Sequence, residues 1–278
     1  MRRRPAVTDA RPDLAEHRGG AINVEAEHDW RALFEREYAL GPTELEDRLT
    51  REALGDEYPE GLAIKSFVSR SDLARFVAEL HVGPWSTLVD VGCGRGGPGV
   101  WVAAQTGATL IGLDIAEAPL GEARQRAVAL GVAATFQRGE FEATGLPDEI
   151  GDAVMSVDAL LFTTDKATAF RELRRILRPG GRLALTSWDY HTQPVGRPPQ
   201  LADHRPVAEA AGFRVLVYDE TPGWRESEDR FGELLLEHVE EIAAASGDTV
   251  EEVRAEIEEE NATGACMIRR FFLVAEAV

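Results

Sequence analysis

The sequence is poor in cysteine and in basic residues, and both shortages limit what the protein can be. It has only two cysteines, Cys93 and Cys266, in 278 residues. Two thiols so far apart make neither a disulfide framework nor a zinc site, so we expect no metal site and a cytoplasmic location. Its 30 basic residues are outnumbered by 49 acidic ones, and the formal net charge is −19. Nucleic acids and anionic membranes need a basic footprint, and we expect neither as a partner.

Long hydrophobic runs are also missing. A membrane-spanning helix needs about 18 or more consecutive apolar residues, and the sequence has no such stretch. Residues 1–4 resemble the start of a signal peptide, but residues 5–20 are polar and broken by prolines. We therefore expect 1–20 to be a disordered arm. What the chain does contain is 44% apolar residues, enough to bury a sizeable core.

From residue 83 onward, short apolar runs alternate with helical stretches. Strands are expected at 87–91, 109–113, 134–137, 153–157, 183–187, 214–218 and 269–275, with helices at 97–106, 119–130, 166–177 and 206–211. Such alternation predicts right-handed strand–helix–strand units. The fold class is therefore α/β, with a Rossmann-like, mostly parallel seven-stranded sheet and helices on both of its faces.

Two helical regions stand apart from this alternation. One is 21–82, which includes a helix at 71–80 that Ser71 is expected to cap; the other is the acidic stretch at about 220–266, inserted between the last two strands. Ligands bind beyond the carboxyl ends of parallel strands, where extra helices can cover them. We interpret both regions as a helical lid on the domain formed by 83–278. The alternative is a solvated appendage or a dimer contact, and a monomer and a homodimer both remain open.

A glycine-rich turn after the first of these strands is the strongest functional signal. It reads Gly92-Cys93-Gly94-Arg95-Gly96-Gly97, and Asp114 follows 20 residues after Gly94. Glycines there permit positive φ and a close approach of ligand, and the following helix offers free amides. The turn also matches the dinucleotide fingerprint, so by itself it leaves an NAD(P)-dependent oxidoreductase open. It lacks the G-K-[ST] of a nucleotide triphosphatase.

Motifs elsewhere in the sequence indicate which class of cofactor the glycine turn binds. Asp90 precedes it, the segment 152–158 ends another strand with Asp158, and Arg178-Pro179-Gly180-Gly181 precedes a late strand. Over residues 87–187 these motifs, in this order, resemble the class I S-adenosylmethionine-dependent methyltransferases. The resemblance implies S-adenosyl-L-methionine as cofactor, an antiparallel last strand, and methyl transfer to O, N or C of a small-molecule metabolite. Non-methylating chemistry on the same fold, such as cyclisation, is the alternative.

The resemblance also assigns roles to individual residues. Those expected to bind the cofactor are Asp90, Gly92, Cys93, Gly94, Asp114, Ile115, Glu140, Phe141, Asp158 and Ala159. Glu140 departs from the residue common in the family, which often has the shorter Asp at this position to contact the adenine. Aromatic candidates for the acceptor pocket are Trp30, Phe162, Trp188 and Trp224. A general base is needed only if the acceptor must lose a proton, and the candidates are Asp158, His191 and Tyr190.

Overall fold

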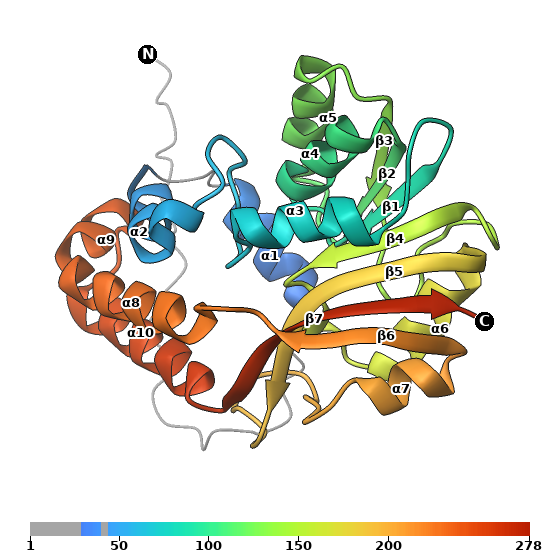
Figure 1. Cartoon of the computed structure of the whole chain (residues 1–278). Coiled ribbons are helices and arrows are strands. Elements are labelled where there is room, and N and C mark those ends of the chain that lie inside the picture. The colour runs from blue at the N-terminus through green and yellow to red at the C-terminus, as the bar shows by residue number, and fades with distance from the viewer. Residues whose placement is uncertain (1–28, 40–43) are drawn as a thin grey trace, which may run out of the picture.

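The computed structural model describes residues 29–39 and 44–278, and the predicted arm at 1–20 lies outside the described residues. At its centre is one seven-stranded sheet in the order β3-β2-β1-β4-β5-β7-β6 (Figure 1). Its strands are β1 (Thr87–Val91), β2 (Thr109–Asp114), β3 (Ala134–Arg138), β4 (Gly151–Val157), β5 (Leu177–Tyr190), β6 (Phe213–Glu220) and β7 (Met267–Ala277). β1 to β5 pair in parallel, whereas β7 is antiparallel to both β5 and β6. The predicted Rossmann-like sheet with an antiparallel last strand is confirmed.

Helices cover both faces of this sheet. The helices of the described residues are α1 (Trp30–Ala39), α2 (Glu44–Leu54), α3 (Arg70–Glu79), α4 (Gly97–Thr106), α5 (Leu120–Ala129), α6 (Lys166–Ile176), α7 (Arg205–Ala210), α8 (Trp224–Glu237), α9 (Val239–Ser246) and α10 (Val250–Gly264), with short 3₁₀ turns at Gly55–Glu57 and Leu160–Phe162. On one face α3, α4 and α5 bury Phe76, Val100 and Ala123 in a shared core. On the other face α6 and α7 bury Phe170 and Ala208. The sheet is therefore covered by helices on both sides, as βαβ units require.

The helix α3 begins earlier than the sequence suggested, and it packs on the sheet. Its N-cap is Ser69 and not Ser71: the Ser69 hydroxyl accepts from the Asp72 amide at 2.9 Å, and the Asp72 carboxylate accepts from the Ser69 amide at 3.2 Å. This reciprocal pair is a capping box. The Phe76 ring of α3 lies 4.7 Å from the ring of Phe272 on β7. Because α3 covers the sheet in this way, it belongs to the central layers, although the sequence placed it with the lid.

The segment between β6 and β7 forms the three helices α8, α9 and α10. Together with α2 they lie beyond the end of the sheet at which the parallel strands finish, on the left of Figure 1. They have a small core of their own, made of Val239, Ala243, Val253 and Ile257. The predicted helical insertion is therefore present at the edge of the sheet where ligands bind in such folds.

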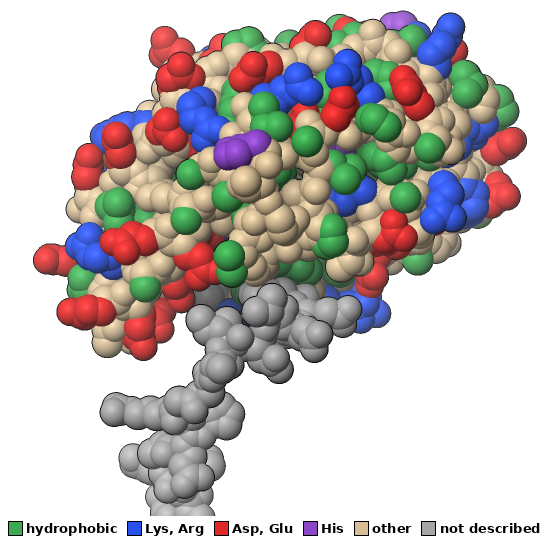
Figure 2. Space-filling model, turned by 90° about the horizontal axis from the view of Figure 1, so that it is seen from below, with side chains coloured by type: hydrophobic (Ala, Val, Ile, Leu, Met, Phe, Trp, Pro, Cys, Tyr) green, Lys and Arg blue, Asp and Glu red, His purple; other side chains and the backbone are tan. Residues whose placement is uncertain are grey.

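The surface reflects the charge counted in the sequence. On the face seen in Figure 2, acidic and basic side chains are interspersed over much of the surface. Several of them form exposed pairs, such as Arg48 with Glu241 at 2.9 Å and Arg230 with Glu52 at 2.6 Å. Within residues 29–39 and 44–278, no helix combines the length and the apolar character needed to cross a bilayer.

Candidate functional site

The glycine turn between β1 and α4 has a backbone that only glycine adopts without strain. Gly92, Gly94 and Gly96 have φ values of +78°, +50° and +75°. The amides of Gly92 and Cys93 both donate to the carbonyl of Leu113 at 2.8 Å, which fixes the turn against the end of β2. A Cβ atom at Gly92 would lie 2.4 Å from the Cβ of Ala159. Position 92 therefore requires glycine, both because of its positive φ and because a Cβ atom would overlap with Ala159.

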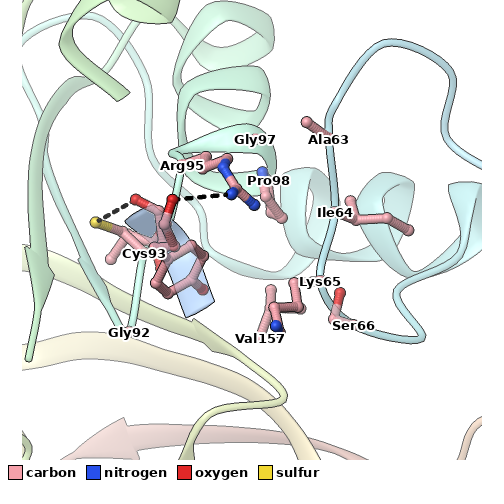
Figure 3. Close-up of a pocket in the computed structure, with 13 residues that line it drawn as sticks. Ala63, Ile64, Lys65, Ser66, Gly92, Cys93, Arg95, Gly97, Pro98 and Val157 are labelled. Atoms are coloured by element: carbon pink, nitrogen blue, oxygen red, sulfur yellow. Dashed lines mark hydrogen bonds between the residues drawn. The ribbon is translucent and has the colours of Figure 1, made fainter. Parts of the chain in front are cut away.

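Two cavities adjoin this turn. The larger has a volume of about 450 Å³ and is bounded by the ends of β1, β2 and β4 on one side and by α1 on the other. The smaller has a volume of about 40 Å³ and lies between the turn and residues 63–66 (Figure 3). Tyr38, Lys65 and Gly92 line both cavities, so they are neighbouring parts of one site.

Two buried carboxylates mark the sheet side of the site. The Asp114 side chain accepts from the amides of Gly94 and Ala116 at 2.8 and 3.0 Å. Burial raises the Asp114 pKa, and the hydrogen bonds from those amides oppose the rise. Asp90 lines the smaller cavity, and its Oδ2 atom has no hydrogen-bond partner among the described residues. Burial, reinforced by the charge of Asp114, raises the pKa of Asp90 to about 7. Asp90 therefore contributes to the cavity wall a buried carboxyl with one unpaired oxygen.

Cys93 lies beside these carboxylates but has the properties of an inert thiol. Its side chain is buried, and its sulfur donates weakly to the Gly94 carbonyl at 3.7 Å. Burial raises the Cys93 pKa well above its ordinary value, and the charges of Asp90 and Asp114 add to the rise. A reactive cysteine needs a lowered pKa, so the geometry supports Cys93 as a small loop residue only.

The opposite wall of the larger cavity is built by α1. The rings of Trp30 and Phe34 lie 5.0 and 4.9 Å from the ring of Phe162, which follows β4. At the rim, Arg31 forms an ion pair with Glu140, and Lys65 pairs with Glu37 at 2.6 Å. Aromatic contacts thus line the inside of this wall, while charged pairs hold its edge.

Basic groups gather around the smaller cavity, close to the unpaired carboxyl of Asp90. Arg95, within the glycine turn, is buried and donates to Glu122 at 3.2 Å and to the Tyr38 carbonyl at 3.4 Å. Its guanidinium carbon lies 4.9 Å from the centre of the Tyr38 ring, and the Lys65 nitrogen lies 5.8 Å from it. The small cavity is therefore lined by one carboxyl, from Asp90, and two cationic side chains, from Lys65 and Arg95. This combination suits a zwitterionic group.

The structure brings together the residues predicted from the sequence for the cofactor. All ten of them line one of the two cavities: Asp90, Gly92, Cys93 and Gly94 the smaller, and Gly92, Asp114, Ile115, Glu140, Phe141, Asp158 and Ala159 the larger. Glu140 reaches the larger cavity, but its carboxylate is already paired with Arg31. Of the four aromatic candidates for the acceptor pocket, Trp30 and Phe162 line the larger cavity.

The contacts of Asp158 argue against its predicted role as a general base. Both of its oxygens accept from the buried guanidinium of Arg270, at 3.0 to 3.3 Å. One also accepts from the Thr186 hydroxyl at 2.7 Å, and the other from the Phe67 amide at 3.0 Å. Arg270 in turn donates to Asp72 at 2.7 Å. With its lone pairs occupied, Asp158 acts as part of the cavity wall and is poorly placed to accept a further proton.

His191, Trp188 and Trp224 also lie elsewhere than the sequence suggested. His191 is exposed and lines neither cavity, although its amide donates to the Cys266 carbonyl at 3.0 Å. A base must reach the proton it removes, so this position does not suit His191 for catalysis. Trp188 and Trp224 are both buried in an aromatic cluster next to the larger cavity. They do not line that cavity, whereas Phe162, which packs against the cluster, does.

Sequence reasoning missed the basic and aromatic residues contributed by α1 and by residues 63–66. Arg31, Phe34, Tyr38 and Lys65 all line the larger cavity. Phe34 and Tyr38 carried a signal, since they lie at helical spacing with Trp30 and so share one helix face. Lys65 carried none, because it lies in an irregular segment that only the tertiary structure brings to the glycine turn.

Comparison with known proteins agrees with this geometry. Residues 89–185 match the family model described as a methyltransferase domain. The predicted recognition of a class I S-adenosylmethionine-dependent methyltransferase domain is therefore confirmed, and S-adenosylmethionine is the cofactor of such domains.

Relatives of known name share this domain. The methyltransferase GfsG of Streptomyces halstedii is 35% identical over 108 residues, which are 38% of this chain and 39% of that protein. Phosphoethanolamine N-methyltransferase 1 of Arabidopsis thaliana is 29% identical over 127 residues, 45% of this chain and 26% of that protein. The chain thus matches only about a quarter to two fifths of the length of these relatives.

Solved structures resemble the chain over more of its length. The [4+2]-cyclase SpnF has a TM-score of 0.66 and 25% identity, covering 87% of this chain and 95% of its own. Geranyl diphosphate C-methyltransferase of Streptomyces coelicolor A3(2), in complex with Mg²⁺, geranyl-S-thiolodiphosphate and S-adenosyl-L-homocysteine, has a TM-score of 0.63 at 17% identity and covers 91% of this chain and 99% of its own. At that identity the second likeness shows the fold alone.

Proposed function

We propose that the protein is an S-adenosylmethionine-dependent methyltransferase that moves a methyl group to an oxygen, nitrogen or carbon atom of a small molecule. The observation that carries the proposal is the pair of joined cavities around a glycine turn, with a buried carboxylate at each. The larger cavity has the volume and the apolar walls of a small-molecule site. The smaller one holds opposite charges within a polar recess.

The larger cavity fits the adenosine part of the cofactor. Asp114 at the end of β2 retains lone pairs beyond those used by the Gly94 and Ala116 amides, so it can accept ribose hydroxyls in charge-assisted bonds. Ile115 and Phe141 offer apolar surface to an adenine. Glu140 is held by Arg31, so we expect its side chain to contact the adenine less closely than the aspartate common in the family.

The smaller cavity fits the amino-acid end of the cofactor. The unpaired oxygen of Asp90 suits an ammonium group, and Lys65 and Arg95 suit a carboxylate. A buried carboxyl without a partner is expensive to retain, and pairing it with a cation would offset that penalty. The orphaned Asp90 atom is therefore the feature of this structure that speaks most directly for the cofactor.

Catalysis would rest on alignment and on the exclusion of water. When bound, the cofactor supplies a methyl group already activated by its sulfonium. The residues of the chain then hold donor and acceptor in line, which can contribute about 7–11 kcal/mol. The α1 wall, whose Trp30 and Phe34 rings pack on Phe162, would help to keep water from the bound ligands. The packed ion pair of Asp158 with Arg270 keeps the floor of the cavity rigid.

Calorimetric titration tests the proposal directly. We expect S-adenosylhomocysteine and S-adenosylmethionine to bind in a one-to-one ratio, and NADH to bind no better than AMP. A preference for NADH, or the absence of binding by either adenosyl ligand, would remove the proposal. Incubation with candidate acceptors, followed by mass spectrometry, would then detect the added methyl group.

Non-methylating chemistry is a second candidate, favoured by the likeness to the [4+2]-cyclase SpnF. Such an enzyme would keep the cofactor cavities but leave the cofactor unchanged. The two candidates differ in one measurement. A methyltransferase forms one S-adenosylhomocysteine for each product, whereas a cyclase forms product with none.

A further inference from the structure

Behind the larger cavity lies an aromatic cluster, which consists of Leu161, Trp188, Tyr190, Trp224 and Met267, with Phe67, Phe162 and Cys266 packed against it. Its members come from the end of β5, the start of α8, the start of β7 and the turn after β4. The apolar atoms of this cluster pack as in an ordinary protein core. Unlike those of an ordinary core, several of its buried polar atoms have no hydrogen-bond partner.

Buried polar atoms without partners are concentrated around this cluster. Among the described residues eight buried side-chain N and O atoms lack a hydrogen bond, and four of them are Trp188 Nε1, Tyr190 OH, Gln200 Oε1 and Glu228 Oε2. Trp188 and Tyr190 are only 5% and 3% exposed. A buried polar group that has lost its water and gained no hydrogen bond destabilises the fold. Four such groups near one cluster therefore point to a ligand that satisfies them.

The four groups belong to one neighbourhood. Burial raises the pKa of the Tyr190 phenol, and the nearby charges of Glu228 and Asp158 add to the rise. The Arg270 guanidinium carbon lies 5.7 Å from the centre of the Trp188 ring. Gln200 donates to the carbonyl of Leu161 at 2.8 Å, which leaves its oxygen as the unpaired atom. Strand β5, helix α8 and the loop after β5 thus each contribute at least one of these four residues.

This neighbourhood adjoins the larger cavity through two side chains. Phe162 lines the cavity and packs against the cluster. Phe67 lies with its ring 6.3 Å from Trp188 and 5.7 Å from Phe231 of α8, and its amide donates to the cavity residue Asp158. Both phenylalanines are only partly buried and pack against the cluster, so they form the boundary between the cluster and the cavity.

The unpaired atoms also define the chemistry of the ligand. Trp188 Nε1 can only donate, Tyr190 OH can donate or accept, and the oxygens of Gln200 and Glu228 accept. Burial raises the pKa of Glu228 to about 7, so near neutral pH its carboxyl is partly ionised. The nearby cations are already engaged: Arg270 with Asp72 and Asp158, Arg225 with the carbonyls of Gly264 and Met267, and Arg197 with Glu260.

We propose that Trp188, Tyr190, Gln200 and Glu228 form a subsite for the polar head of the methyl acceptor, and that this head carries an N–H or O–H group on an apolar body. The proposal rests on the proposed function, because it places the acceptor beside the cofactor cavity. Acceptor atoms outnumber donors in the subsite, so a group that donates hydrogen bonds is preferred. The surrounding rings bind the apolar body, and they also favour a cationic amine.

Benzylamine, benzyl alcohol and benzyl methyl ether are suitable probes, because they share one ring and differ in the donor. Protein labelled with ¹⁵N is titrated with each probe, with and without S-adenosylhomocysteine, and the indole resonance of Trp188, assigned with Trp188→Phe, reports binding. We expect the amine or the alcohol to shift this resonance and to bind at least about fivefold more tightly than the ether, the effect of one buried hydrogen bond.

Three variants complete the test. Glu228→Gln and Tyr190→Phe should weaken the preferred probe about fivefold or more while leaving S-adenosylhomocysteine affinity unchanged. Glu226→Gln, at an exposed position of the same helix, is the matched control and should change neither. Equal binding of the ether, no shift at Trp188 with any probe, or unchanged binding in both variants would overturn the subsite. If S-adenosylhomocysteine itself failed to bind, the proposed function would fall, while the titrations without it would still report on the subsite.

Discussion

The two walls of the larger cavity are built in opposite ways. The sheet wall consists of strand ends and the glycine turn, and its residues Gly92, Asp114 and Ala159 are fixed by buried contacts. The helix wall is α1, which has no buried residue and is held at its edge by ion pairs of half-exposed side chains. Exposed ion pairs contribute about 0–1 kcal/mol each. The comparison teaches that the sheet wall sets the shape of the site, and it predicts that α1 is the wall more easily displaced.

The largest expected effect comes from adding a side chain to the sheet wall. Gly92→Val would place a branched side chain at a φ of +78° and against Ala159. Strain and overlap together amount to about 2–5 kcal/mol, so we expect affinity for S-adenosylhomocysteine to fall about a hundredfold or more. Calorimetry measures the affinity, and a thermal melt checks that the variant is folded.

Gly121→Ala is the matched control for this change. Gly121 lies in α5, and a Cβ atom there would meet nothing within 4 Å. We expect unchanged affinity and a slightly higher melting temperature, because alanine is the better helix former. Near-normal binding by Gly92→Val would show that the sheet wall is as adaptable as the helix wall.

A smaller loss is expected when a charge is removed from the same wall. Asp114→Asn keeps the size of the side chain but loses its charge-assisted hydrogen bonds, and its amide group would face the Gly94 N–H. We expect affinity for S-adenosylhomocysteine and for adenosine to fall about tenfold, as measured by calorimetry. An equal affinity of variant and wild type for adenosine would argue that Asp114 serves only the turn.

Asp90 gives the sheet wall a pH dependence. Its pKa is raised to about 7 in the folded protein, so this group destabilises the ligand-free fold increasingly as pH rises from about 4 to 7. At pH 8 the free energy of unfolding of Asp90→Asn, measured by urea titration, should therefore exceed that of wild type by about 1–3 kcal/mol. Near pH 4 the two proteins should differ little. The same variant should bind S-adenosylhomocysteine about tenfold more weakly, because an amide cannot pair with its ammonium group. A variant that is less stable than wild type at pH 8 would contradict an unpaired Asp90.

The smallest effect is expected on the helix wall. Arg31→Met removes the exposed ion pair with Glu140 but keeps the aliphatic packing. We expect a loss of affinity below about fivefold, and one that disappears at high salt because the pair is screened. Titrations at low and high sodium chloride measure it. A tenfold loss that persists in salt would mean that α1 is part of the rigid site, and the comparison between the walls would fail.

The sheet side of the site could be predicted from the sequence because its signals are local. A strand, a glycine turn and a helix follow one another in 87–106, and the acids at 90 and 114 stand at strand ends that parallel pairing brings to one edge. The same holds for the βαβ elements, where predicted and observed bounds of β1 and α4 coincide. The sequence does not distinguish Ser69 from Ser71 as the N-cap of α3, because both serines precede the apolar face of the helix. The structure shows that Ser69 is the cap.

The acceptor side could not be predicted in the same way. Trp188 and Trp224 were chosen for their chemistry, but burial in the cluster behind Phe162 depends on how α8 returns to the sheet. In the sequence His191 and Asp158 are equally acceptable as candidate bases, because both are titratable residues that follow predicted strands. Only the contacts reveal that the first is exposed and that Arg270, 112 residues further along the chain, occupies the second.

The sequence by itself determined the order of strands and helices, the glycine turn and the two acids beside it, because periodicity and turn chemistry act between residues that are close in the chain. The tertiary structure alone decided which side chains meet across the cavity: α1 over the turn, Lys65 and Arg95 beside Asp90, and the orphaned polar atoms of Trp188, Tyr190 and Glu228 around one cluster. The physical reason is that burial and charge pairing depend on distance in space, and these residues are brought together only when the sheet, its helical insertion and α1 pack against one another.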